Sequence, residues 1–102
     1  MRFLVTIRQK HMVPPEVQIG LFEGSIAWIK KYTASQKMEQ HWGFAGLPGG
    51  GGVLNVNSAE ELDQIMSELP LAAISDIEII PLVDPVESIT RAKNVLLSMV
   101  KK

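Results

Sequence analysis

Hydrophobic and polar residues alternate at the start of the chain, over residues 2–8. Phe3, Val5 and Ile7 fall on one side of this segment, and the residues between them fall on the other. Alternation with a period of two is typical of a strand that buries one face. The pattern therefore predicts a first strand at residues 2–8.

The following segment changes to helical spacing. Pro14 and Pro15 precede Glu16, and proline and an acidic residue both favour the first turn of a helix. From there to about Ser35 the apolar residues cover more than half of the helix circumference. These residues are Val17, Ile19, Leu21, Phe22, Ile26, Trp28, Ile29 and Tyr32. We expect a helix that contacts two surfaces.

A second alternating segment covers residues 37–46 and predicts a second strand. Its alternation separates Met38, Gln40, Trp42 and Phe44 from Lys37, Glu39, His41, Gly43 and Ala45. Four glycines at 49–52 then interrupt the pattern before it resumes at 53–56. We interpret the glycines as a flexible hairpin loop or lid between strands two and three. No Lys-Ser/Thr pair and no helix follows them, which excludes a phosphate-binding loop.

The second half of the chain carries clear helix-start signals. Ser58 and Glu61 have the spacing of a capping box, and Pro70 ends the helix that this box begins. Residues 76–82 are typical of a fourth strand. Asp84, followed by a proline and an acid, starts a third helix. The apolar stripe of that helix consists of Val86, Ile89, Ala92, Leu96, Met99 and Val100.

The predicted order β-α-β-β-α-β-α defines an α+β fold of ferredoxin-like topology with an extra C-terminal helix. We expect one domain over residues 1–102, since this length suits a single core. Two helices cover only one face of such a sheet, so a second copy is expected to cover the other and enclose a cleft. That face is predicted to carry Leu4, Val53, Ile80, Thr6, Arg8, Glu39, His41, Asn55 and Glu78.

Composition narrows the function classes further. The chain has no cysteine, which excludes disulfides, thiolate metal sites and a cysteine nucleophile. Its formal net charge is −1 without a basic stripe, so nucleic acid is not an expected partner. No apolar segment approaches the roughly 20 residues of a membrane helix, and no signal peptide is evident. We therefore expect a cytoplasmic protein. We also expect a homo-oligomer, because 46% apolar residues is a surplus for a small chain.

Several landmarks along residues 37–82 resemble the muconolactone Δ-isomerase family. They are Trp42 to Gly46, Val53 to Val56, Ser58, Leu62, Leu69 to Leu71 and Asp76 to Glu78. The resemblance implies a dimeric α+β barrel, often in larger rings. It also implies a cofactor-free enzyme of aromatic compound catabolism that moves a proton in a small unsaturated lactone. The chain departs from the family pattern at Glu39 and Gly43, where the family has basic residues, and at 48–52.

Three titratable side chains are candidates for proton transfer. His41 is the first candidate for a general base, because an unperturbed imidazole titrates near neutral pH; its alternative is a structural histidine. Glu78 can shuttle a proton or form a salt bridge to Arg8 across the sheet. Glu39 shares the predicted cleft face with His41, and its charge would repel an acidic substrate unless Arg8 or Lys37 compensates.

Four further residues are candidates for substrate binding. Arg8 can hold a carboxylate through its bidentate guanidinium, and Thr6 and Asn55 can donate or accept neutral hydrogen bonds. Trp42 can form the wall of a pocket for a flat substrate, although its alternation with Met38 favours core packing.

No cofactor or metal is expected. His11 and His41 are the only histidines, and no His or carboxylate cluster has metal spacing. Haem ligation by a single histidine stays an alternative. Two functions stay open: a cofactor-free isomerase that shifts a proton next to a carbonyl group, and a non-catalytic small-ligand-binding or oligomeric module.

Overall fold

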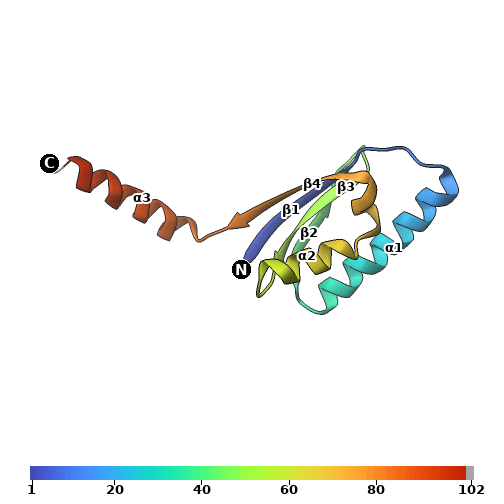
Figure 1. The fold of residues 1–102 in the computed structure, drawn as a ribbon, viewed down its shortest axis with the longest axis horizontal. Helices are drawn as coiled ribbons and strands as arrows, with labels where there is room; N and C mark the ends of the chain where they lie inside the picture. The colour runs from blue at the N-terminus through green and yellow to red at the C-terminus, as the bar shows by residue number, and fades with distance from the viewer. Residues whose placement is uncertain (101–102) are drawn as a thin grey trace.

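The computed structural model describes residues 1–100 as a four-stranded sheet, two helices on one of its faces, and a third helix beyond the sheet (Figure 1). The elements are β1 (Arg2–Gln9), α1 (Pro15–Ala34), β2 (Met38–Gly43), β3 (Gly49–Asn55), α2 (Ala59–Ser67), the short 3₁₀ helix η1 (Pro70–Ile74), β4 (Ser75–Leu82) and α3 (Pro85–Val100). The strand order is β2-β3-β1-β4, and every neighbouring pair is antiparallel. This confirms the predicted α+β fold and element order.

The helix starts follow the local signals in the sequence. α1 has proline at its first position and Glu16 in its first turn. At α2, the Ser58 side chain accepts a hydrogen bond from the Glu61 N–H at 3.1 Å. The Glu61 carboxylate in turn accepts the Asn57 N–H at 3.0 Å. The predicted cap therefore forms, with the return bond one residue before the usual position.

The core lies between the sheet and the two helices. Phe3 and Val5 from β1 and Leu54 from β3 are buried against apolar residues of α1 and α2. The Trp28 indole N–H donates to the Ile65 carbonyl at 2.9 Å. This bond connects α1 to α2 and satisfies the single polar group of a buried tryptophan.

The four glycines at 49–52 belong to strand β3, so their prediction as a flexible loop or lid was wrong. Strand ladders use backbone groups, and Gly50 and Gly52 pair with Ile7 and Val5 of β1. A Cβ on Gly50 would lie 2.3 Å from the Trp42 carbonyl oxygen. The missing side chain therefore lets β2 approach β3 closely.

A β-bulge at Glu39 reverses the alternation of β2. Met38 pairs with Leu54 of β3, but the pairing shifts before Gln40, which opposes Val53. One extra residue moves every following side chain to the other face. The predicted alternation was therefore wrong after Met38.

The reversed alternation exchanges the positions of His41 and Trp42. His41 opposes Gly52 and lies on the helix-covered side, whereas Trp42 opposes Gly51 and lies on the uncovered side. The second strand also ends at Gly43 rather than at residue 46. His41 is therefore absent from the uncovered face, where the sequence had placed it.

Helix α3 forms as predicted, but none of its described residues is buried. It continues outward from the end of β4, away from the sheet (Figure 1), and the described chain measures 66 × 27 × 23 Å. Its large apolar residues, from Leu97 at 48% exposed to Val100 at 81%, face away from any core. No helix within residues 1–100 is long and apolar enough to cross a membrane.

Candidate functional site

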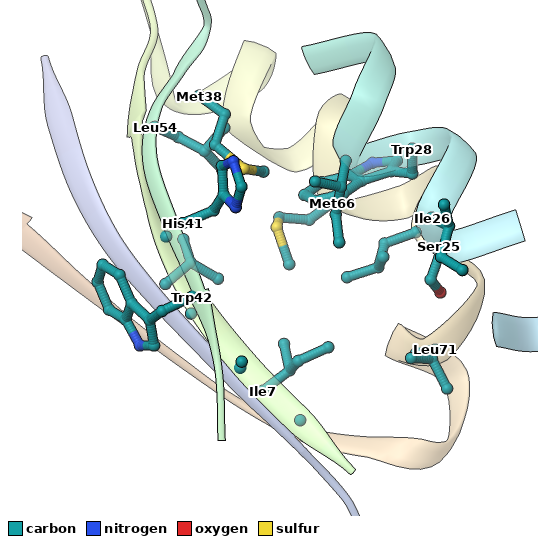
Figure 2. A pocket seen from close by; sticks show the side chains of 18 of the residues that line it. Ile7, Ser25, Ile26, Trp28, Met38, His41, Trp42, Leu54, Met66 and Leu71 are labelled. Carbon is teal, nitrogen blue, oxygen red and sulfur yellow. The ribbon is translucent and has the colours of Figure 1, made fainter. Parts of the chain in front are cut away.

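A cavity of about 420 Å³ lies between the helix-covered face of the sheet and α1 (Figure 2). Apolar side chains of the sheet, of both helices and of η1 form most of its lining. The lining residues are Val5, Ile7, Phe22, Ser25, Ile26, Trp28, Ile29, Met38, His41, Trp42, Gly43, Gly49–Gly52, Leu54, Met66, Leu69 and Leu71. A mainly apolar cavity with few polar groups is typical of a small-molecule site.

The glycines of β3 form the floor of this cavity. Gly50 and Gly52 lie on the helix-covered side of the sheet, opposite Ile7 and Val5 of β1. Because neither carries a side chain, space remains between β3 and α1 that larger residues would fill. The glycine run therefore shapes the cavity.

His41 projects into the cavity from β2. Figure 2 shows its ring on the same side of the sheet as Met38 and Met66. The bulge at Glu39 is the local cause, since a regular strand would direct this side chain to the opposite face. His41 is the only side chain with an acid–base function near neutral pH among the lining residues.

Ser25 is the second polar side chain of the lining, and it was not among the site residues predicted from the sequence. It lies on α1, is only 5% exposed, and its hydroxyl has no hydrogen-bond partner within residues 1–100. A buried hydroxyl without a partner costs about 1–3 kcal/mol, so native proteins rarely keep one without a reason. The available signal was a serine within the apolar arc of the helix.

The remaining predicted site residues lie on the uncovered face of the sheet, and of these Trp42 alone also borders the cavity. Thr6 pairs with Gly51 on one side and with Glu78 on the other. Trp42 opposes the same glycine, and Figure 2 shows its ring pointing away from the cavity. A Cβ on Gly51 would lie 2.8 Å from the Trp42 indole nitrogen. The ring therefore packs against Gly51 on the uncovered side of β3.

The carboxylate of Glu39 is paired with a residue other than those expected. Arg2 Nε lies 2.6 Å and Arg2 Nη2 lies 3.2 Å from the two Glu39 oxygens. This bond lowers the pKa of Glu39 and raises the pKa of Arg2. Lys37 instead contacts Glu61 at 3.0 Å. Glu39 is therefore compensated by Arg2, and neither Lys37 nor Arg8, the two residues considered from the sequence, pairs with it.

Arg8 makes contacts other than the salt bridge to Glu78, which was one of the two alternatives for Glu78. Its guanidinium lies 5.5 Å from the centre of the Phe44 ring, and its direct neighbour on β4 is Asp76. The ion pairs of the described chain include no bridge from Arg8 to Glu78. Asn55 lies at the other end of the uncovered face, opposite Arg2. The polar candidates of this face are thus spread along the sheet rather than gathered.

Residues 1–100 contain no group of three or more His, Asp or Glu side chains placed to hold a metal ion. The cavity therefore offers one imidazole and one hydroxyl within an apolar lining. Together with the sheet order, it places the chain among α+β proteins of ferredoxin-like topology with a pocket between the sheet and the helices.

Within that class, the chain belongs to the muconolactone delta-isomerase family, whose model matches residues 1–86. Most of α3 lies beyond this match. A search of curated proteins found no match.

Two solved structures are similar to this one. A muconolactone isomerase crystal structure matches with a TM-score of 0.75 and 26% identity, covering 83% of this chain and 92% of the other. A 5-chloro-2-hydroxyhydroquinone dehydrochlorinase from Burkholderia phenoliruptrix AC1100, in complex with 2,5-dihydroxybenzoquinone, matches with a TM-score of 0.64. The latter is 16% identical over 85% of this chain and 98% of that chain, and it shows a shared fold.

Proposed function

We propose that the protein is a cofactor-free isomerase that shifts a proton in a small unsaturated lactone or a related carbonyl compound. The observation that carries this proposal is the position of His41, the one acid–base side chain in the lining of an otherwise apolar cavity. Membership of the muconolactone delta-isomerase family supports the reaction class.

The proposed reaction needs one group that both accepts and returns a proton. A ring nitrogen of His41 removes a proton from the saturated carbon beyond the conjugated double bond, and the electrons of that C–H bond move through the double bond to the carbonyl oxygen. The resulting imidazolium then protonates the carbon next to the carbonyl, which restores the carbonyl and moves the double bond one position further from it. The lining places mainly apolar side chains around the intermediate.

We further propose that the protein works in the cytoplasm as a homodimer or larger homo-oligomer. The uncovered sheet face supports the proposed assembly, since Ile80 is 46% exposed and both Trp42 and Leu82 are 39% exposed there. Apolar surface of this kind is a common site of association. In this arrangement the polar candidates Thr6, Arg8, Asn55, Glu39 and Glu78 border the interface between copies.

Proton NMR of the protein with small unsaturated lactones in D₂O tests the proposed reaction. We expect the isomer of at least one lactone, with deuterium at the carbon next to the carbonyl, at a rate well above that in buffer. A folded protein that leaves every lactone unchanged would contradict the proposal.

The alternative is a non-catalytic module that binds a small ligand in the same cavity. A cavity of about 420 Å³ is large enough to bind a small ligand, and binding alone needs no base. Such a protein would shift the amide signals of Gly50 and Gly52 on adding a lactone, but would leave the deuterium content of the lactone unchanged.

A further inference from the structure

The charge of the cavity lining bears on the kind of ligand it can hold. None of the lining residues is Lys, Arg, Asp or Glu. Arg2 and Lys37, which are close in sequence to lining residues, are paired with Glu39 and Glu61. Within residues 1–100, no cationic side chain thus lines the cavity.

An anionic ligand would lose water on entering this space and gain no opposite charge. Transfer of a carboxylate into an apolar site is strongly unfavourable without a paired cation. A neutral ring of similar size meets no such penalty and gains contact with Ile26, Met66 and Leu71 on the walls (Figure 2).

Ser25 adds a directional contact to this apolar lining. Its hydroxyl is buried and unpartnered among the described residues, on the helix wall facing the sheet that carries His41. A hydroxyl in that state can donate one hydrogen bond without breaking another. A ligand carbonyl oxygen that accepts this bond would relieve the unpaired group.

We infer that the cavity takes a small uncharged cyclic carbonyl compound rather than a carboxylate, and that the Ser25 hydroxyl donates a hydrogen bond to its carbonyl oxygen. This inference rests on the proposed function for the reacting atoms. During proton removal by His41, the carbonyl oxygen gains negative charge, and the bond from Ser25 strengthens. The proton later returns from His41 to the ligand, so no co-reactant is consumed.

A matched pair of ligands tests the ligand class. Muconolactone carries a carboxylate with an ordinary pKa of about 4, and its methyl ester is a neutral ligand with the same ring. Binding at pH 7.5 is measured from the changes in the amide chemical shifts of Gly50 and Gly52. Turnover is measured as deuterium uptake by the ligand, compared with a protein-free control. We expect the ester to bind at least tenfold more tightly than the acid.

The two readouts separate this inference from the proposed function. Equal or tighter binding of the acid, or no binding of either ligand to the folded protein, would overturn the inference. Ester binding without deuterium uptake would support the inference and contradict the isomerase. Deuterium uptake together with tighter binding of the acid would support the isomerase and contradict the inference.

The role of Ser25 has its own test in the full-length protein. Ser25→Ala should weaken ester binding by about tenfold, the value of one hydrogen bond, while Tm stays equal or rises because an unpaired hydroxyl is removed. Thr33→Ala, on the exposed side of the same helix, should leave ester binding unchanged. Unchanged binding in Ser25→Ala would overturn the proposed contact.

Discussion

At the scale of single residues, the carboxylate of Glu68 binds two side chains of α1, those of Lys31 and Tyr32. The Tyr32 hydroxyl donates to its carboxylate at 2.5 Å, and Lys31 Nζ lies 3.0 Å from the same oxygen. The bond from Tyr32 first, and that from Lys31 second, lower the pKa of Glu68 below its ordinary value. Burial, followed by the bond to Glu68, raises the pKa of Tyr32.

The lowered pKa predicts a pH dependence of stability. A carboxyl with a lower pKa in the folded state stabilises the fold above its unfolded pKa, about 4.3. This contribution is lost as the pH falls through the lower folded value. We expect the Tm of Glu68→Gln to fall less than that of the wild type between about pH 5 and pH 3, measured by circular dichroism.

Glu23→Gln, on the exposed surface of α1, is the matched control and should keep the wild-type slope. The same slope in Glu68→Gln and in the wild type would contradict the assigned role of the Glu68 cluster.

At the scale of elements, local sequence signals predicted the helices well. They did not predict the bulge in β2 or the strand formed by the glycines, because both depend on pairing between strands. Pro15 and the Ser58 cap fix helix starts within a few residues of chain. The bulge at Glu39 depends on how β2 fits against a glycine strand, which no short segment encodes. The glycine run itself has the composition of a loop, yet its backbone completes the sheet.

The same dependence on pairing hid the candidate site. Since His41 and Trp42 exchange faces at the bulge, the sequence pattern assigned both residues to the wrong side of the sheet. Ser25 carried no motif, and only the three-dimensional packing shows that its hydroxyl is buried and unpaired.

Two glycine substitutions test how β2 and β3 fit together. Gly50→Ala would place a Cβ 2.3 Å from the Trp42 carbonyl oxygen, and we expect a loss of about 1–3 kcal/mol in the free energy of unfolding. Gly20→Ala, inside α1 with nothing within 4 Å, should instead gain about 0.5–1 kcal/mol. Urea denaturation measures both, and equal effects would contradict the close approach.

At the scale of the whole molecule, two apolar surfaces of the described chain have no covering layer. One is the open sheet face with Ile80, and the other is the apolar arc of α3, in which Ile89 and Leu96 are 68% and 62% exposed. Helix α3 stands clear of the sheet (Figure 1). A helix with one apolar side is stabilised mainly by packing that side, so assembly is expected to involve α3.

The assembly role of α3 predicts a change in mass. Ile89→Gln combined with Leu96→Gln should yield smaller particles than the wild type in light scattering after gel filtration. Asn94→Gln combined with Ser98→Gln, on the polar side of α3, should keep the wild-type mass. A monomeric wild type, or an unchanged mass in the first variant, would contradict this role.

The central claim is that His41 transfers a proton inside the cavity. The most direct test is the rate of deuterium uptake in D₂O by a lactone that the wild-type protein isomerises. His41→Gln should slow uptake by about 100-fold or more, the typical contribution of a general base, without loss of Tm. His11→Gln, in the loop before α1 and outside the cavity lining, should keep the wild-type rate. Uptake at the wild-type rate in folded His41→Gln would contradict the claim.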